Sequence, residues 1–134
     1  MIMIYQSFMI HREEQITLAG KALRMTFETV NSLFGNREIK YISTSGKKGK
    51  TLRLEVRFEN TMFTCMFNQD NICSMVFLFF DNQNDIGHYI EYCKQSYKYD
   101  AESYSWINND CYIWLYNEDN ITNLVFSTLN PIDS

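Results

Sequence analysis

Residues 44–51, TSGKKGKT, come closest in this sequence to a nucleotide-binding pattern. They end in Gly-Lys-Thr, as a Walker A phosphate loop does, but Thr44 stands where that pattern needs a glycine. The residues that follow, LRLEVRF, alternate with the period of a strand, whereas a phosphate loop runs into a helix whose amides hold the anion. The segment therefore predicts a hairpin turn and no nucleotide or other cofactor. Its lysines form at most a weak anion patch of Lys47, Lys48 and Lys50.

One helix-forming stretch holds the residue types that acid–base catalysis uses. Asp85, His88 and Glu91 recur at helical spacing, so their side chains share one side of a helix. His88 falls on the polar side of the apolar stripe, and no serine or cysteine has the surroundings of a nucleophile. A solvated helix face accounts for these residues, so no catalytic residue is predicted. A small enzyme with an acid–base site near this helix is the alternative.

Two aspartates occupy equivalent turns, Asp70 in NQDN and Asp119 in NEDN. Paired carboxylates serve glycosidases and calcium sites, but these turns lack the alternating oxygen ligands and the glycine of an EF-hand loop. Asn and Asp stabilise turns by bonding to their own backbone, and turn formation accounts for both residues.

The four cysteines lie among apolar residues, without a C-x-x-C pair and without a histidine that would complete a zinc site. We therefore predict no metal site and buried free thiols that act as small apolar side chains. A disulfide is the alternative for an exported protein. The cysteines are Cys65, Cys73, Cys93 and Cys111.

Length and composition predict a single compact domain, 1–134, because 46% of the 134 residues are apolar and 21% are charged. With a net charge of −4, the chain lacks the excess of basic residues with which nucleic-acid binders contact phosphates, so no nucleic-acid partner is expected. No apolar run is long enough to cross a bilayer, which predicts no membrane insertion. The abundance of Asn, Ile, Lys and Tyr suggests an AT-rich bacterial genome.

The apolar start of the chain, 1–10, lacks the basic region and cleavage site of a signal peptide. It predicts an extra strand or a packed N-terminal arm. We expect a cytoplasmic protein if Met1 is the native start, and an envelope or secreted protein if a signal preceded it.

Periodicity supplies the elements that position these residues. Between residues 12 and 34, apolar residues recur at steps of three and four, which predicts one helix ending at Gly35. The alternation of TLRLEVRF predicts a strand with one buried face and one wet face. The full predicted order is a helix over 12–34, strands over 37–44, 51–58, 62–67 and 72–80, a helix starting near Asn84, and strands over 99–107, 111–116 and 121–129.

A near-repeat joins two parts of this pattern. Residues 62–77, MFTCMFNQDNICSMVF, are echoed 49 positions later by 111–126, CYIWLYNEDNITNLVF. Independent selection of Asn/Asp turns is the alternative, but the flanking strand residues match in character as well. We predict two pseudo-repeats: 12–80 with a helix and four strands, and 81–129 with a helix and three strands.

Aromatic residues follow the strands of the second unit, and their orientation depends on one turn. A two-residue turn at Glu59-Asn60 pairs Val56 with Phe63 and buries the aromatic rows, whereas a three-residue turn points them outward. Core packing is one interpretation. The functional hypothesis is a binding surface on the sheet, because Tyr and Trp on a rigid sheet offer large contact area with little loss of entropy. Its candidate residues are Tyr104, Trp106, Tyr112, Trp114 and Tyr116.

Together these patterns predict an α+β fold, with two helices on one face of a mostly antiparallel sheet in the order α-β-β-β-β-α-β-β-β. Tandem helix-plus-meander units of this kind resemble, at the level of the fold, the β-lactamase-inhibitor-like proteins, and the resemblance implies nothing about function. We expect a non-enzymatic module that binds a protein partner or a small ligand through the sheet face opposite the helices. A structural homodimer is a further alternative.

Overall fold

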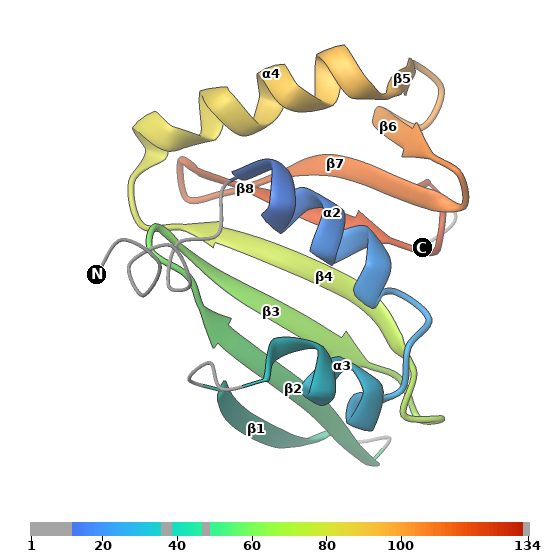
Figure 1. Ribbon diagram of the computed structural model, residues 1–134. Helices are drawn as coiled ribbons and strands as arrows, with labels where there is room; N and C mark the ends of the chain where they lie inside the picture. Colours follow the sequence, from blue (N-terminus) through green and yellow to red (C-terminus); the bar gives the residue numbers. More distant parts are fainter. Residues whose placement is uncertain (1–11, 36–38, 47–48, 133–134) are drawn as a thin grey trace.

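The computed structural model describes residues 12–35, 39–46 and 49–132, with side chains omitted over 39–46 and 49–51. Lys47, Lys48 and the predicted N-terminal strand or arm lie outside the described residues. Within the described ranges, helices pack on one antiparallel sheet, which confirms the predicted α+β class (Figure 1). The elements are α2 Arg12–Ala22, α3 Phe27–Phe34, β1 Ile39–Gly46, β2 Gly49–Arg57, β3 Thr61–Phe67, β4 Cys73–Phe80, the 3-10 helix η1 Gln83–Asp85, α4 Ile86–Ser96, β5 Lys98–Asp100, β6 Ser105–Asn108, β7 Cys111–Glu118 and β8 Ile121–Ser127.

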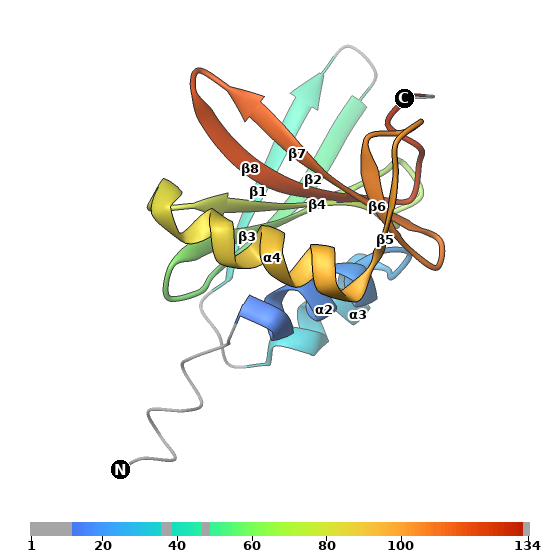
Figure 2. The same cartoon turned by 90° about the horizontal axis from the view of Figure 1, so that it is seen from above.

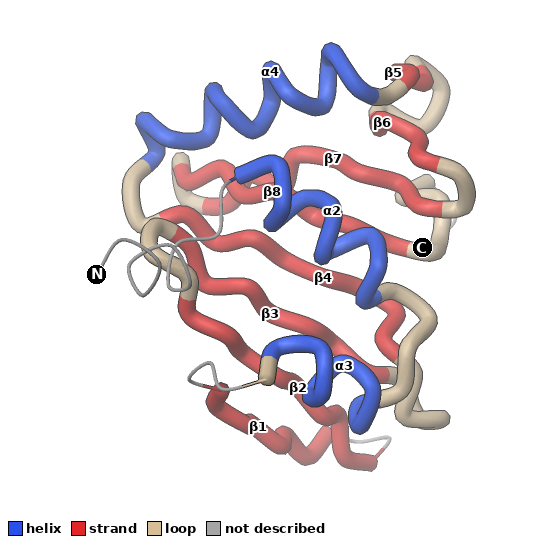
Figure 3. The backbone as a smooth tube through the Cα atoms, viewed as in Figure 1, coloured by secondary structure: helices blue, strands red, loops and turns tan. Residues whose placement is uncertain are grey.

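The sheet has eight strands in the order β1-β2-β3-β4-β8-β7-β6-β5 over the described residues (Figure 3). Two meanders therefore meet at a central seam, where β4 and β8 run antiparallel. Side chains extend this seam where the strands diverge. Asn123 Oδ1 accepts a hydrogen bond from the Phe80 amide at 3.2 Å. Gln83 bonds both backbone groups of Thr122, at 2.7 and 3.0 Å.

The described helices all lie on one face of the sheet, and the core fills the space between (Figure 2). The β2 alternation is confirmed, because Leu54 and Val56 are fully buried in this core while Arg57 is exposed. A buried polar cluster ties the helices to the sheet. Gln15 Oε1 on α2 accepts hydrogen bonds from Thr61 Oγ1 at 2.8 Å and from the Tyr89 hydroxyl on α4 at 3.0 Å.

The predicted single helix over 12–34 is wrong, because the chain breaks into α2 and α3. Arg24 adopts a left-handed φ of 74°, and its amide donates to the Cys73 carbonyl at 2.8 Å. The Cys73 amide in turn donates to the Met25 carbonyl at 2.8 Å. Thr26 then caps α3 through its Oγ1, which accepts from the Thr29 amide at 3.3 Å. Backbone bonds to the start of β4 thus replace one helical turn. The described residues therefore hold three α-helices, and the predicted helix over 12–34 accounts for two of them.

The second unit has four strands in the structure, and not the predicted three. Residues 99–107 fold back on themselves as β5 and β6, so that Tyr99 pairs with Trp106. Asp100 Oδ2 accepts a hydrogen bond from Ser103 Oγ at 2.6 Å within the turn. Tyr104 completes the reversal with a φ of 55°. Hydrogen bonds of side chains within the turn therefore stabilise a hairpin where the sequence pattern predicts one continuous strand.

The two hairpins of the sequence echo have the same register. Phe63 pairs with Leu78, and 49 positions later Tyr112 pairs with Ser127. The turn at Glu59-Asn60 has two residues, since the Phe58 amide donates to the Thr61 carbonyl at 2.9 Å. Val56 therefore pairs with Phe63, which is fully buried against the helices.

The central seam nevertheless turns the two hairpins over relative to each other. Val76 pairs with Phe126, so these two side chains share the helix-covered face. Val125, the sequence match of Val76, must then face the opposite side, because strand side chains alternate. Rows that match at the 49-residue offset consequently lie on opposite faces of the sheet. Common descent of the two units stays a prediction.

All four cysteines are free and buried within the described part of the chain, which confirms the predicted buried thiols. A hydrogen bond between the thiols of Cys65 and Cys73 raises the pKa of Cys65 and lowers that of Cys73. Burial raises the pKa of Cys93 to about 12 and that of Cys111 to about 11. Such protonated thiols behave as apolar core residues at neutral pH.

Candidate functional site

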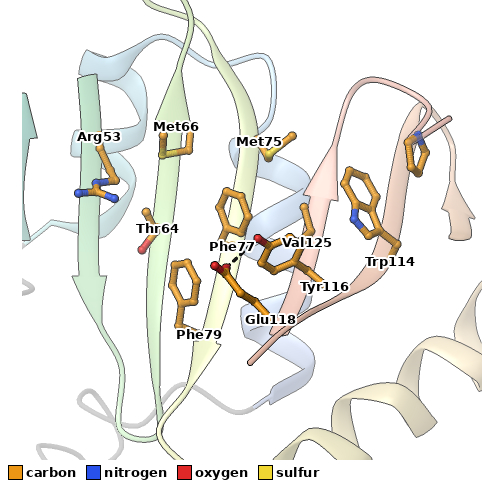
Figure 4. A pocket seen from close by; sticks show the side chains of 11 residues that line it. Arg53, Thr64, Met66, Met75, Phe77, Phe79, Trp114, Tyr116, Glu118 and Val125 are labelled. Atoms are coloured by element: carbon orange, nitrogen blue, oxygen red, sulfur yellow. Dashed lines mark hydrogen bonds between the residues drawn. The ribbon is translucent and has the colours of Figure 1, made fainter. Parts of the chain in front are cut away.

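The helix-free face of the sheet holds an open pocket of about 520 Å³, called here the sheet-face pocket. Figure 2 shows the hairpins β1–β2 and β7–β8 rising from the sheet on the side away from the helices. The strand residues of the pocket come from both meanders and span the central seam (Figure 4). It is lined by Arg53, Thr64, Met66, Met75, Phe77, Phe79, Trp114, Tyr116, Glu118, Val125 and Pro131.

Aromatic rings form the centre of the sheet-face pocket. The Phe77 and Phe79 rings stack with centroids 5.4 Å apart and an interplanar angle of 7°. Tyr116 meets Phe77 edge-on, at 6.5 Å and 79°. Met66 and Met75 lie opposite each other on β3 and β4 and are half-buried. Aromatic rings and flexible thioethers together offer an apolar surface that adapts to the shape of a ligand.

Two buried polar atoms in the pocket lack a hydrogen-bond partner among the described residues: Arg53 Nε and Thr64 Oγ1. Thr64 is only 2% exposed, so its hydroxyl has little access to bulk water. Figure 4 shows both side chains on the same side of the pocket, with Trp114 on the other side. An unsatisfied buried polar group opposes folding by about 1–3 kcal/mol, so the pair calls for a functional explanation.

Carboxylates border the pocket on two sides. Glu55 Oε1 lies 3.5 Å from Arg53 Nε, an ion-pair distance without hydrogen-bond geometry. Glu118 Oε2 accepts a hydrogen bond from the Tyr116 hydroxyl at 2.7 Å. This hydrogen bond and the nearby negative charge raise the pKa of Tyr116, so its hydroxyl stays protonated.

The structure brings together only part of the predicted aromatic surface. Tyr112, Trp114 and Tyr116 share the helix-free face, and the latter two line the pocket. Trp106 lies on the other face, 5% exposed in the core, because it pairs with the buried Ile113. Tyr104 sits in the β5–β6 turn and is 71% exposed.

The other sequence candidates lie away from the pocket. His88 and Glu91 are exposed on α4, and Asp85 is the residue that precedes this helix. Lys50 is described only as backbone of β2. Across the described residues, no three His, Cys, Asp or Glu side chains gather into a metal site. None of the described helices has the length and apolar character to cross a bilayer.

Sequence reasoning missed the residues that the first meander contributes to the pocket. The outward positions of MVFLFF alternate, so Met75, Phe77 and Phe79 share one face. That alternation was available as a signal, but the run is apolar on both sides and does not reveal which face is wet. Arg53 was the better signal for the wet face, because a charged side chain in an alternating strand normally points to solvent.

Comparisons with known proteins add no assignment. No protein-family model matches the chain, and no curated protein and no solved structure matches it either.

Proposed function

We propose that this protein is a non-enzymatic binding module, and that the sheet-face pocket takes a small, largely apolar ligand. The observation that carries the proposal is the open apolar pocket on the one sheet face that none of the described helices covers. Its volume of about 520 Å³ falls within the range of roughly 300–1,000 Å³ that is usual for small-molecule sites.

The composition of this face supports binding over simple solvation. A sheet face that meets only water normally carries polar side chains. Here the central positions are Met66, Met75, Phe77 and Val125, whereas charged residues stand at the margins. Contiguous exposed apolar surface with a polar rim is typical of ligand and partner sites.

The second unit is turned over relative to the first, so its residues Trp114 and Tyr116 face the pocket and line the side opposite Arg53 and Thr64. If the two units derive from one ancestral hairpin, the row that is Phe63, Cys65 and Phe67 in the core became Tyr112, Trp114 and Tyr116 on the surface. Tyrosine and tryptophan suit that position, because each combines an apolar body with a polar tip. We propose that this change served ligand binding.

A neutral solvatochromic dye such as Nile red tests the proposal. We expect saturable fluorescence enhancement with the wild-type protein, and its loss in Met75→Lys, where a half-buried side chain becomes charged at the pocket floor. Leu115→Lys is the matched control, because Leu115 is 41% exposed on β7 but faces the other side of the sheet. Equal enhancement in both variants, each folded by circular dichroism, would contradict the assignment.

A further inference from the structure

We infer that the ligand of the sheet-face pocket carries an uncharged oxygen acceptor, such as an amide or ester carbonyl, at one end of its apolar body. This inference rests on the proposed binding function and adds the chemistry of the ligand's polar group. It is argued from the two buried polar atoms that lack a hydrogen-bond partner among the described residues, Arg53 Nε and Thr64 Oγ1, and from the charges around them.

The position of the polar group follows from Arg53 and Thr64. They stand on the adjacent strands β2 and β3, two residues out of register, since Arg53 pairs with Met66 and Glu55 pairs with Thr64. Antiparallel pairing places all four side chains on one face, so Arg53 Nε and Thr64 Oγ1, the two atoms without a hydrogen-bond partner among the described residues, belong to the same wall. A single oxygen atom of a ligand at this wall would lie beside both groups.

Hydrogen-bond chemistry then selects an acceptor. Arg53 Nε carries a hydrogen and only donates, while the Thr64 hydroxyl rotates to donate where an acceptor is offered. A carbonyl oxygen has two lone pairs and accepts from both at once. A pure hydrocarbon would leave both buried groups unsatisfied, so it gains nothing at this wall.

The surrounding charges disfavour an anionic head. Glu55 already lies 3.5 Å from Arg53 Nε and offsets the charge of the guanidinium. Glu118 adds a second carboxylate on the pocket lining. Among the side chains that the structure describes at this wall and on the pocket lining, one cation stands with two anions, so a ligand carboxylate meets net negative charge from them. An uncharged carbonyl makes the same hydrogen bonds without that repulsion.

The apolar body of the ligand extends from this wall across the seam. Phe77 and Val125 lie between Thr64 and Trp114 in the sheet, because each pairs with the next across β3, β4, β8 and β7. A planar ring laid along this row contacts aromatic and branched side chains on consecutive strands. The pocket therefore suits a flat or extended body with its carbonyl at the β2–β3 end.

Three compounds with the same ring separate these features: naphthalene, 2-naphthamide and 2-naphthoate. Affinities are measured by equilibrium dialysis through naphthyl fluorescence. We expect wild-type protein to bind the amide about fivefold or more tightly than naphthalene, as one or two net hydrogen bonds provide, and more tightly than the carboxylate. In Thr64→Val the amide should lose most of this advantage while naphthalene binds as before. Thr17→Ala, an exposed change on α2, should leave all three affinities unchanged.

Each outcome has a distinct meaning. Equal affinities for the three compounds would overturn the inferred acceptor head and leave the proposed binding function in place. Tightest binding of 2-naphthoate would overturn the claim that the head is uncharged. Loss of naphthalene binding in Thr64→Val would mean that the variant damages the pocket, and Arg53→Met, which keeps the apolar stem, then provides the same test. Failure of all three compounds to bind wild-type protein would contradict the proposed function itself.

Discussion

Two buried threonines on β3 differ in whether their hydroxyl groups have a hydrogen-bond partner. Thr61 faces the helices and donates its hydroxyl to Gln15 Oε1 at 2.8 Å. Thr64 faces the sheet-face pocket and has no partner among the described residues. Both are nearly inaccessible, at 0% and 2% exposed. The first hydroxyl therefore stabilises the fold, whereas the second opposes it unless the proposed ligand supplies an acceptor.

Valine substitutions at these two positions should change stability in opposite directions. Thr64→Val removes an unsatisfied polar atom without changing the side-chain shape, so we expect the free energy of unfolding to rise by about 1 kcal/mol. Thr61→Val leaves the Gln15 amide short of one partner and should lower it by about 1–3 kcal/mol. Urea denaturation of both variants measures the two differences. A destabilised Thr64→Val would show that its hydroxyl has a structural role.

At the scale of elements, the sequence predicted local patterns well and long-range ones poorly. The strands over 51–58, 62–67 and 72–80 and the start of α4 follow from alternation and capping, which depend on neighbouring residues. The break between α2 and α3 does not, because it is stabilised by backbone bonds to Cys73, about fifty residues away. Thr26 carried a usable signal, since a threonine followed by Phe-Glu-Thr suits a helix N-terminus.

The N-cap of α3 gives a test of this break. Thr26→Ala removes the side chain that accepts from the Thr29 amide, so we expect a loss of about 1 kcal/mol in the free energy of unfolding. Thr17→Ala is the control, because Thr17 is exposed inside α2, where alanine is the better helix former. Thermal or urea unfolding compares the two. Equal stability of both variants and the wild type would show that the cap does not stabilise the helix break.

At the scale of the whole molecule, the register of β4 against β8 decides which side chains of the two hairpins face the helix-free side of the sheet. Alternation within each strand predicted two opposite rows, but which row is wet depends on a pairing between residues about fifty positions apart. The predicted row of Tyr112, Trp114 and Tyr116 shares the helix-free face, whereas Trp106 was wrongly grouped with it, because Trp106 pairs with the buried Ile113 and faces the core. The Arg53–Thr64 wall was not predicted, because an unsatisfied atom is visible only once every neighbour is placed.

The buried ionisable groups predict how the stability of the whole fold depends on pH. Burial raises the pKa of Cys93 to about 12 and of Cys111 to about 11, from an ordinary value of 9.0. The unfolded chain therefore loses these protons first, and stability that is fully present below about pH 9 declines as pH rises toward the folded values. Each group contributes a slope of about 1.4 kcal/mol per pH unit in that window.

Urea denaturation at pH 8, 9 and 10 in the presence of a reductant measures this slope. Tyr97, whose pKa burial raises to about 12, adds to the decline only above pH 10. Cys93→Ala should be less stable than wild type at pH 8 and should lose less stability between pH 9 and 10. A free energy of unfolding that stays constant up to pH 10 would be inconsistent with protonated thiols in the core.

The most direct test of the sheet-face pocket is an NMR titration of protein labelled at its methionine methyl groups, with 2-naphthamide as the probe. Met66 and Met75 line the pocket, whereas Met25 packs against the core on the helix side and serves as the internal control. We predict that the Met66 and Met75 methyl signals shift together and saturate with one dissociation constant, while the Met25 signal stays in place. Signals of Met66 and Met75 that do not move, or that move no more than Met25, would contradict the assignment of this face as the binding site.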